Sequence, residues 1–389
     1  MGALRRIPTV WPTAFRWLTA VLICAIAPAQ STTSPTTAPS PADRDAAIAQ
    51  AQSHWTIATS DFARGQFDLA INEGHTVLGY YHQAYGNTPI AAEARTHMGL
   101  GNCLVAMNRP ADAIAEFQAS LEIYQQVYPN QDRTEIAIDT GRIGWCDHLL
   151  GRDDEGAKRL IAAAAIVKRM GEKQPTAELS GDLYLAAQSL EAMDRAEDAL
   201  PMRLAALNIA KRLAGGADTV NMAIQLDGVG ECLMSLGRFA QAIDYFQGAV
   251  AMGKRLLHGG DSYPMATGLE HEGDCLNNMG RYPDALVMLQ ASLDMRRRLA
   301  HGVDNPDVIA GLNSVAVCLS NMNRDNEALP MHQQSLAMAR RLAGTKDTAV
   351  VAYCMEYVAN DLLELHRPTE ALPLLQGALD MRRRTHCAG

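Results

Sequence analysis

The chain has 389 residues, of which 48% are hydrophobic but only 5% aromatic, so its core must consist largely of Ala, Leu, Met, Ile and Val. These residues are mostly good helix formers and favour an all-α fold over a sheet. The formal net charge of −9 argues against nucleic acid as the main ligand, because phosphate binding requires a basic surface.

Residues 1–29 have the pattern of a secretory signal peptide. Three arginines precede an apolar stretch of 11 residues, Trp17–Ala27, and Ala27-Pro28-Ala29 provides small residues for cleavage before Gln30. The apolar stretch is shorter than the roughly 20 residues that span a bilayer. We therefore expect an exported protein, periplasmic or extracellular, whose cleavage removes three Arg and changes the formal charge from −9 to −12.

The same segment allows two other relationships to the membrane. An uncleaved N-terminal anchor is the minor alternative, and a lipid anchor on Cys24 is disfavoured because Ile23 precedes it where such sites need a small residue. Residues 30–42 are rich in Ser, Thr, Pro and Ala, carry no charge and predict a flexible linker. Residues 43–389 contain no stretch as long as a membrane span, so we expect a soluble mature protein.

A short turn recurs at a fixed interval along residues 43–389, and Gly280-Arg281-Tyr282-Pro283-Asp284-Ala285-Leu286 is its clearest copy. Its basic position recurs every 43 residues, at Gln66, Arg109, Arg152, Arg195, Arg238, Arg281, Arg324 and Arg367. Equal spacing leaves no room for insertions, so the eight repeats must be structurally equivalent.

Two further positions keep this spacing and always hold Ala or Gly. Four residues after the basic position stand Ala70, Ala113, Gly156, Ala199, Ala242, Ala285, Ala328 and Ala371, and eight before it stand Ala58, Gly101, Gly144, Ala187, Gly230, Gly273, Ala316 and Ala359. Two helices joined by a tight turn pack closely only if their contact positions lack bulk. Larger side chains there would overpack the crossing at a cost of roughly 1–3 kcal/mol each.

Apolar residues recur every three or four positions on both sides of the turn, which predicts a helix, a tight turn, a longer helix and a loop in each repeat. In the sixth repeat Leu269, Gly273 and Leu276 mark the first helix, and the second ends near Leu299. A loop follows, in which Asn305 is placed to cap the next helix before Pro306.

The small residue, the Gly-Arg-Tyr turn and the Ala four residues beyond the Arg resemble the tetratricopeptide repeat (TPR). The long repeat and the loops at 302–308 and 312–316 are similar to the kinesin light chain-like subclass. The resemblance covers residues 46–384 and implies an all-α, right-handed superhelical solenoid of eight 43-residue TPR-like helix pairs. The large first-helix aromatic of the family is mostly absent. Gln66 and Asp61 give the first repeat the character of a terminal cap.

Five of the eight cysteines share one repeat position: Cys103, Cys146, Cys232, Cys275 and Cys318. Equivalent positions in successive repeats lie roughly 10 Å apart, too far for a disulfide. No Cys-x-x-Cys pair provides zinc-ligand spacing. We therefore expect buried structural thiols. Cys354 and Cys387 lie outside this position and are the candidates for greater reactivity.

The sequence contains none of the motifs that support a catalytic function. The 11 histidines show no metal-ligand spacing, and phosphate-binding Gly-Lys loops, Gly-x-Ser-x-Gly and His-Glu-x-x-His are missing. The repeats also occupy the chain almost completely. We expect no enzyme, no cofactor and no metal site.

Basic pairs end most of the second helices: Lys168-Arg169, Lys211-Arg212, Lys254-Arg255, Arg297-Arg298, Arg340-Arg341 and Arg383-Arg384. One interpretation is a basic ridge for an anionic partner or a membrane surface. The other is that the cations complement helix dipoles, at roughly 0.3–1 kcal/mol each. Their position at the helix C-termini favours the second.

Function is expected from the side chains that the first helices present to a concave groove, as the resemblance to TPR domains implies. The candidates are Tyr184, Gln188, Asp227, Glu231, Glu270, Asp274, Asn277, Asn278, Asn313, Asn321, Glu356 and Asn360. Amides can bind a peptide backbone and acids can select Lys or Arg, which favours an adaptor or scaffold for a protein or peptide, with a basic one suited to the acids. The alternative for these residues is a merely solvated helix face.

A structural role through the ends of the solenoid is the second functional hypothesis. The last predicted helix carries Leu372, Leu375, Ala378 and Leu379, which a further repeat would normally cover. Exposed apolar surface of this kind favours self-association or assembly into an envelope complex.

Overall fold

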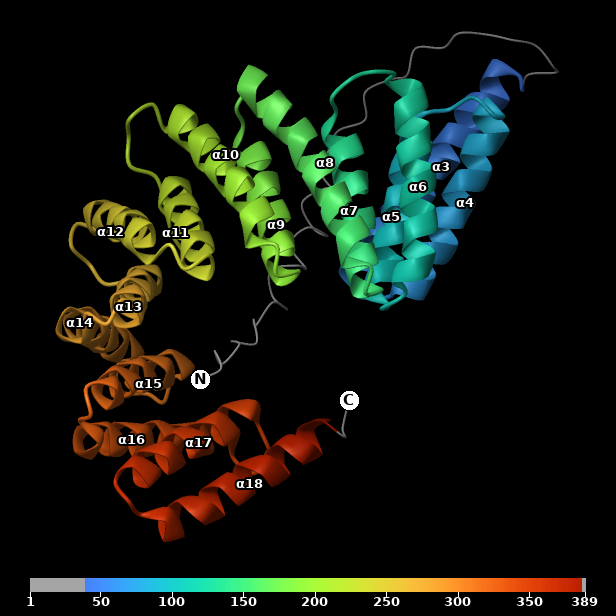
Figure 1. Ribbon diagram of the computed structural model, residues 1–389. Helices are drawn as coiled ribbons and strands as arrows, with labels where there is room; N and C mark the ends of the chain where they lie inside the picture. The colour runs from blue at the N-terminus through green and yellow to red at the C-terminus, as the bar shows by residue number, and fades with distance from the viewer. Residues whose placement is uncertain (1–38, 387–389) are drawn as a thin grey trace. The chain divides into compact units, whose positions relative to one another are not determined.

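The computed structural model describes residues 39–386, which form 16 α-helices and no strand (Figure 1). The helices of repeats one to four are α3 (Pro41–Ala63), α4 (Phe67–Tyr85), α5 (Ala91–Ala106), α6 (Pro110–Val127), α7 (Thr134–Leu149), α8 (Asp153–Lys173), α9 (Ala177–Ala192) and α10 (Ala196–Ala214). Those of repeats five to eight are α11 (Val220–Ser235), α12 (Phe239–Leu256), α13 (Tyr263–Asn278), α14 (Tyr282–Ala300), α15 (Pro306–Asn321), α16 (Asp325–Ala343), α17 (Ala349–Glu364) and α18 (Pro368–His386).

The described residues divide into two compact units, 39–205 and 206–386, with the boundary inside α10. Within each unit the second helix of one repeat packs on the first helix of the next, as α6 does on α7 and α14 on α15. Each unit is thus a stack of helix pairs, and the predicted α-solenoid of 43-residue repeats is confirmed.

The turn between paired helices depends on a residue in the left-handed region, directly before the basic position. Glycine fills this place in four repeats, for example Gly280 with φ of 75°. The other four use Asn108, Asp194, Asn323 and His366, with φ between 57° and 61°. The next residue begins the second helix: Arg281 is the N-cap of α14 and its guanidinium contacts Asp284 at 2.7 Å.

The two small-residue positions are buried where paired helices cross. A Cβ added to Gly101 would lie 2.5 Å from the Phe117 ring, and one added to Gly230 would lie 2.5 Å from the Phe246 ring. The alanines of the other position are almost completely buried as well. The close helix contact predicted from the sequence is confirmed.

The basic pairs have a role that neither sequence interpretation included. In five repeats the second residue of the basic pair is an arginine whose guanidinium makes two contacts with an aspartate. This aspartate lies in the loop before the first helix of the same repeat. These pairs are Arg169–Asp132, Arg255–Asp218, Arg298–Asp261, Arg341–Asp304 and Arg384–Asp347. The arginine lowers the pKa of its aspartate in each pair. These arginines therefore join the end of each of these five repeats to its beginning, in addition to lying at helix C-termini.

The cysteines behave as predicted with one exception. The five that share a repeat position are buried free thiols, and burial raises the pKa of Cys103, Cys146 and Cys275 to about 12. The expectation of greater reactivity at Cys354 is wrong, because its side chain is 1% exposed and lies 3.2 Å from the Ser335 hydroxyl. Burial raises the pKa of Cys354 too, and Cys387 lies outside the described residues.

The predicted signal peptide (1–29) and most of the predicted linker (30–42) lie outside the described residues. Helix α3 begins at Pro41 with Ser40 as its N-cap, two residues before the predicted start of the repeat domain. None of the helices from α3 to α18 combines the length and the apolar character needed to cross a membrane.

The last helix is only partly uncovered. Leu372 and Leu379 are 56% and 49% exposed, as expected, and Leu375 is half-buried. Ala378 was expected to be uncovered but is 1% exposed, because it is part of the hydrophobic core of repeats six to eight. The exposed apolar surface of α18 is therefore narrower than the sequence predicts.

Candidate functional site

In the second unit the first helices α11, α13, α15 and α17 contact one another in succession. Their outward side chains consequently form one continuous side of the stack. We call it the first-helix surface and define it by the predicted residues that reach it: Asp227, Glu231, Asp274, Asn277, Asn278, Asn321, Glu356 and Asn360. Asn278, Asn321 and Asn360 are exposed and the others half-buried. Tyr184 and Gln188 are half-buried residues of the first unit.

Glu270 does not belong to this surface, which corrects the sequence prediction. It is 8% exposed, and its carboxylate accepts hydrogen bonds from Arg296 Nη2 and Ser314 Oγ, both at 2.6 Å. Burial raises the pKa of Glu270, but Arg296 and Ser314 outweigh it, so the pKa lies below its usual value. Glu270 joins α13 to α14 and α15 and is not available to a partner.

Two other candidate residues, Glu356 and Tyr184, also contact arginine side chains. Glu356 accepts a hydrogen bond from Arg382 Nη2 at 2.6 Å, and the Arg382 guanidinium lies over the ring of Tyr353. In the first unit the Arg203 guanidinium lies 4.1 Å from the Tyr184 ring centroid. Both candidates therefore serve in packing, although Glu356 remains half-buried and reachable from solvent.

The amides connect neighbouring repeats but keep binding capacity. Asn321 donates to Asn277 Oδ1 at 3.1 Å, which joins α15 to α13, and Asn278 donates to the backbone carbonyl of Asp274. Asn313 points toward the Cys354 thiol at 3.9 Å and is thereby directed inward. Since an amide carries two donors and an acceptor, the exposed Asn278 and Asn321 can bind further groups.

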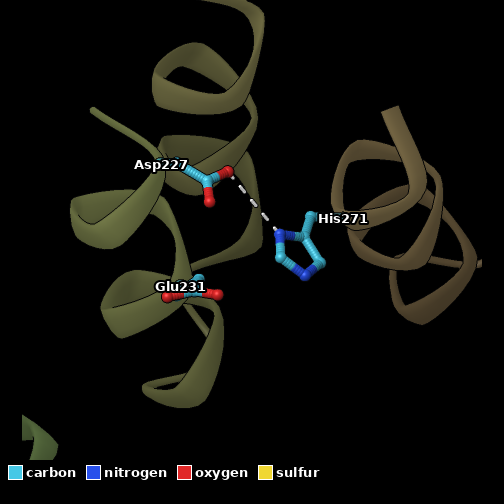
Figure 2. A group of neighbouring side chains, drawn as sticks. All are labelled: Asp227, Glu231 and His271. Carbon is cyan, nitrogen blue, oxygen red and sulfur yellow. Dashed lines mark ion pairs between the residues drawn. The ribbon is translucent and has the colours of Figure 1, made fainter. Parts of the chain in front are cut away.

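Asp227 and Glu231 of the first-helix surface form a group of potential metal ligands with the buried His271 (Figure 2). Asp227 and Glu231 lie one turn apart on α11, and His271 faces them from α13. One ligand atom from each side chain lies within 4.8 Å of the others. His271 is 7% exposed and its ring packs against Phe246, with 5.0 Å between the ring centroids.

The contact between His271 and Asp227 is incomplete. His271 Nδ1 and Asp227 Oδ1 are 3.7 Å apart, which is too long for a hydrogen bond. Neither buried atom has a hydrogen-bond partner within the described part of the chain. Burial lowers the pKa of His271, but the Asp227 and Glu231 carboxylates outweigh it, so the pKa is raised.

His271 was not among the candidates predicted from the sequence, although both acids were, because metal ligands were expected only at short spacings. Several side chains that meet across adjacent first helices are one repeat and one residue apart, although others, such as Asn313 and Cys354, are 41 residues apart. The spacing is 44 residues for Asn277 with Asn321 and for Glu270 with Ser314. Searching for His, Asp and Glu at this spacing would have found Asp227 and His271.

Comparison with known proteins supports the fold. Models described as tetratricopeptide repeat match residues 56–127, 264–341 and 351–386. No curated protein sequence matches the chain. Among solved structures, BtubC (BKLC) from P. vanneervenii is 17% identical with a TM-score of 0.51, covering 59% of this chain and 92% of its own.

Two further solved structures match the chain. The apo form of RapI is 12% identical with a TM-score of 0.51, and the match covers 86% of this chain and 98% of RapI. The nearly identical TPR-like repeats of a kinesin light chain from Podosopora anserina are 11% identical. Their TM-score is 0.46, and the match covers 54% of this chain and 98% of that one.

Proposed function

Because the chain contains tetratricopeptide repeats, we propose that it is a non-catalytic adaptor that binds a protein or peptide along the first-helix surface. The observation that carries this proposal is the continuous row of amides and carboxylates on successive first helices of repeats five to eight. Repetition at one spacing suits a ligand that is itself extended and repetitive, such as a peptide backbone.

The chemistry of the row indicates what the ligand would present. The exposed amides of Asn278, Asn321 and Asn360 can donate to carbonyls and accept from N–H groups of an extended chain. Asp274 and the Asp227–Glu231 pair favour Lys or Arg side chains. We therefore propose a basic, extended segment as the partner.

Site-specific photo-crosslinking tests which side of the stack binds. A photoreactive amino acid at Asn321 or Asn360 would lie on the first-helix surface, whereas one at Gln333 or Gln334 would lie on the exposed side of the second helix α16. We expect native extract to give the same crosslinked protein from the first two positions and not from the controls. The proposed surface would be contradicted if positions 333 and 334 gave crosslinks to that protein as strongly as positions 321 and 360.

A charge reversal tests the preference for basic segments, using the protein identified by crosslinking. Asp274→Lys is expected to weaken its binding by at least about tenfold, and more strongly at low salt, because opposed charges are less screened there. Asp244→Lys, at an exposed position of the second helix α12, is the matched control. Equal affinities of the two variants, with unchanged circular dichroism, would exclude an electrostatic role for Asp274.

A second candidate function is assembly through the exposed side of α18, and it would make the chain a structural component of an envelope complex. The supporting observation is the exposure of Leu372 and Leu379, which lie seven residues apart on one helix face. Self-association would appear as a dimer in sedimentation velocity that Leu372→Gln with Leu379→Gln returns to monomer. A monomeric wild-type chain at high concentration would exclude it.

The export of the chain remains a proposal from the sequence. Cleavage before Gln30 predicts a mature N-terminus at that residue and recovery from an extracytoplasmic fraction. N-terminal sequencing of the natural protein tests this, and an intact N-terminus in the membrane pellet would instead support the uncleaved anchor.

A further inference from the structure

Asp227 occupies the same repeat position as Glu270 and Glu356 but lacks their counter-charge. Each glutamate is paired with an arginine 26 residues later, Arg296 and Arg382. The residue 26 positions after Asp227 is Gly253. A Cβ at Gly253 would lie 2.7 Å from Met265 Cγ, so an arginine there would require the Met265 side chain to move.

His271 takes the place that Ser314 has in the next repeat. Ser314 reaches Glu270 with a 2.6 Å hydrogen bond, whereas His271 stops 3.7 Å from Asp227. The imidazole is buried and held against Phe246, and its Nδ1 has no hydrogen-bond partner within residues 39–386. Glu231 adds a second carboxylate one turn along α11 (Figure 2). The buried nitrogen thus faces Asp227 across a gap too long for a hydrogen bond, with a second acid close by.

We propose that Asp227, Glu231 and His271 bind a divalent transition-metal ion of the Zn²⁺ class. One imidazole nitrogen and two carboxylate oxygens are a donor set that suits such an ion, and the two carboxylates balance its charge. Ions that take only oxygen ligands, such as Mg²⁺ and Ca²⁺, are less well matched.

The geometry requires little adjustment. A tetrahedral ion with bonds of roughly 2.1 Å separates its ligand atoms by roughly 3.4 Å. The three ligand atoms now lie within 4.8 Å of one another, and Glu231 is half-buried rather than enclosed. Three protein ligands leave a coordination position for water. The ion would join α11 to α13, hence repeat five to repeat six, whether or not the adaptor function is correct.

Calorimetric titration of the metal-free full chain with ZnCl₂, and separately with MgCl₂, tests the site. We expect one Zn²⁺ per chain, weaker or undetectable Mg²⁺ binding, and an increase in the thermal unfolding temperature with Zn²⁺. Asp227→Asn and Glu231→Gln keep the side-chain shape, and each is expected to weaken Zn²⁺ binding by at least about tenfold and to remove the thermal shift. Both variants should retain wild-type circular dichroism when metal-free.

Asp274→Asn is the matched control, since Asp274 occupies the repeat position of Glu231 on the next first helix, and it should bind Zn²⁺ like the wild type. The visible spectrum of the Co²⁺ form separates the proposed ligands from cysteine, because only thiolate ligation adds an intense near-ultraviolet charge-transfer band. The proposal is overturned by a wild-type chain that binds no Zn²⁺ or by that thiolate band. It is also overturned if the Asp227→Asn and Glu231→Gln variants bind Zn²⁺ as tightly as the wild type.

Discussion

The two compact units share one backbone plan but place their charges differently. At the repeat position of Glu270 the first unit has Trp55, Met98, Gly141 and Tyr184, and the second has Asp227, Glu270, Asn313 and Glu356. Two residues earlier on the same helices the pattern reverses: the first unit has Ser53, Thr96, Asp139 and Asp182, and the second has Gln225, Gly268, Gly311 and Cys354. The scaffold therefore tolerates acids at either position, provided that neighbouring side chains compensate them.

The largest expected effect comes from breaking the buried pair of Glu270 and Arg296. Glu270→Ala leaves a buried arginine without its carboxylate, which should lower the free energy of unfolding by about 3–5 kcal/mol. The double variant Glu270→Leu with Arg296→Met should recover most of this loss, because it removes both charges and keeps the volume. Urea denaturation of the three proteins provides the measurement. If Glu270→Ala lowers the free energy of unfolding by less than about 1 kcal/mol, the pair is not buried in solution.

A pH dependence should distinguish the first unit from the second. Burial raises the pKa of Asp139 to about 7, with Arg142 and the Ser120 hydroxyl opposing it. Because the folded chain holds this proton more tightly than the unfolded chain, whose Asp pKa is about 3.9, the free energy of unfolding falls as the pH rises from about 4 to about 7. The loss is at most about 4 kcal/mol.

Asp139→Asn should remove most of this pH dependence. Urea denaturation at the two ends of the range measures it, and hydrogen exchange should place the destabilisation in α7 and its neighbours, since the equivalent residues of the second unit are not acids. An unchanged slope in the variant would assign the pH dependence to other groups, with Asp182, whose pKa burial raises to about 6, as the next to test.

The smallest effect concerns what the two units share. Gly101→Ala in the first unit and Gly230→Ala in the second both push a Cβ to 2.5 Å from a phenylalanine ring, so each should cost about 1–3 kcal/mol. Gly181→Ala is the matched control, because no atom lies within 4 Å of its added Cβ and alanine favours the helix. Thermal unfolding compares them. Clearly different costs at positions 101 and 230 would mean that the helix crossing is not equivalent in the two units.

Much of the fold follows from local rules that act within one repeat. The 43-residue spacing, the small residues at the crossing and the left-handed turn residue are each visible in the sequence, and Asn305 caps α15 as predicted. The exposure of the candidate site residues was harder to predict, because it depends on side chains that the following helices bring to them. Glu270 is covered only because Ser314 and Arg296 reach it from α15 and α14.

The cysteine position shows the same limit. Asp361 stands in repeat eight where five other repeats have Cys, and no sequence pattern explains the change. In the structure His332 lies 2.7 Å from its carboxylate and Ser320 donates to it, so the acid is compensated by side chains from repeat seven.

The sequence by itself determined the helix pairs, their number and their register, because helix periodicity, turn conformation and close packing depend on residues less than one repeat apart. Only the tertiary structure decided which polar side chains are used in packing and which face solvent. That outcome depends on individual side-chain contacts between helices: with the next helix for Glu270 and Arg296, 26 residues apart, and with the next repeat for Asp227 and His271, 44 residues apart. A single difference between repeats can therefore change the charge balance of a site without changing the helices. Gly253 is an example, because two other repeats have an arginine at its position.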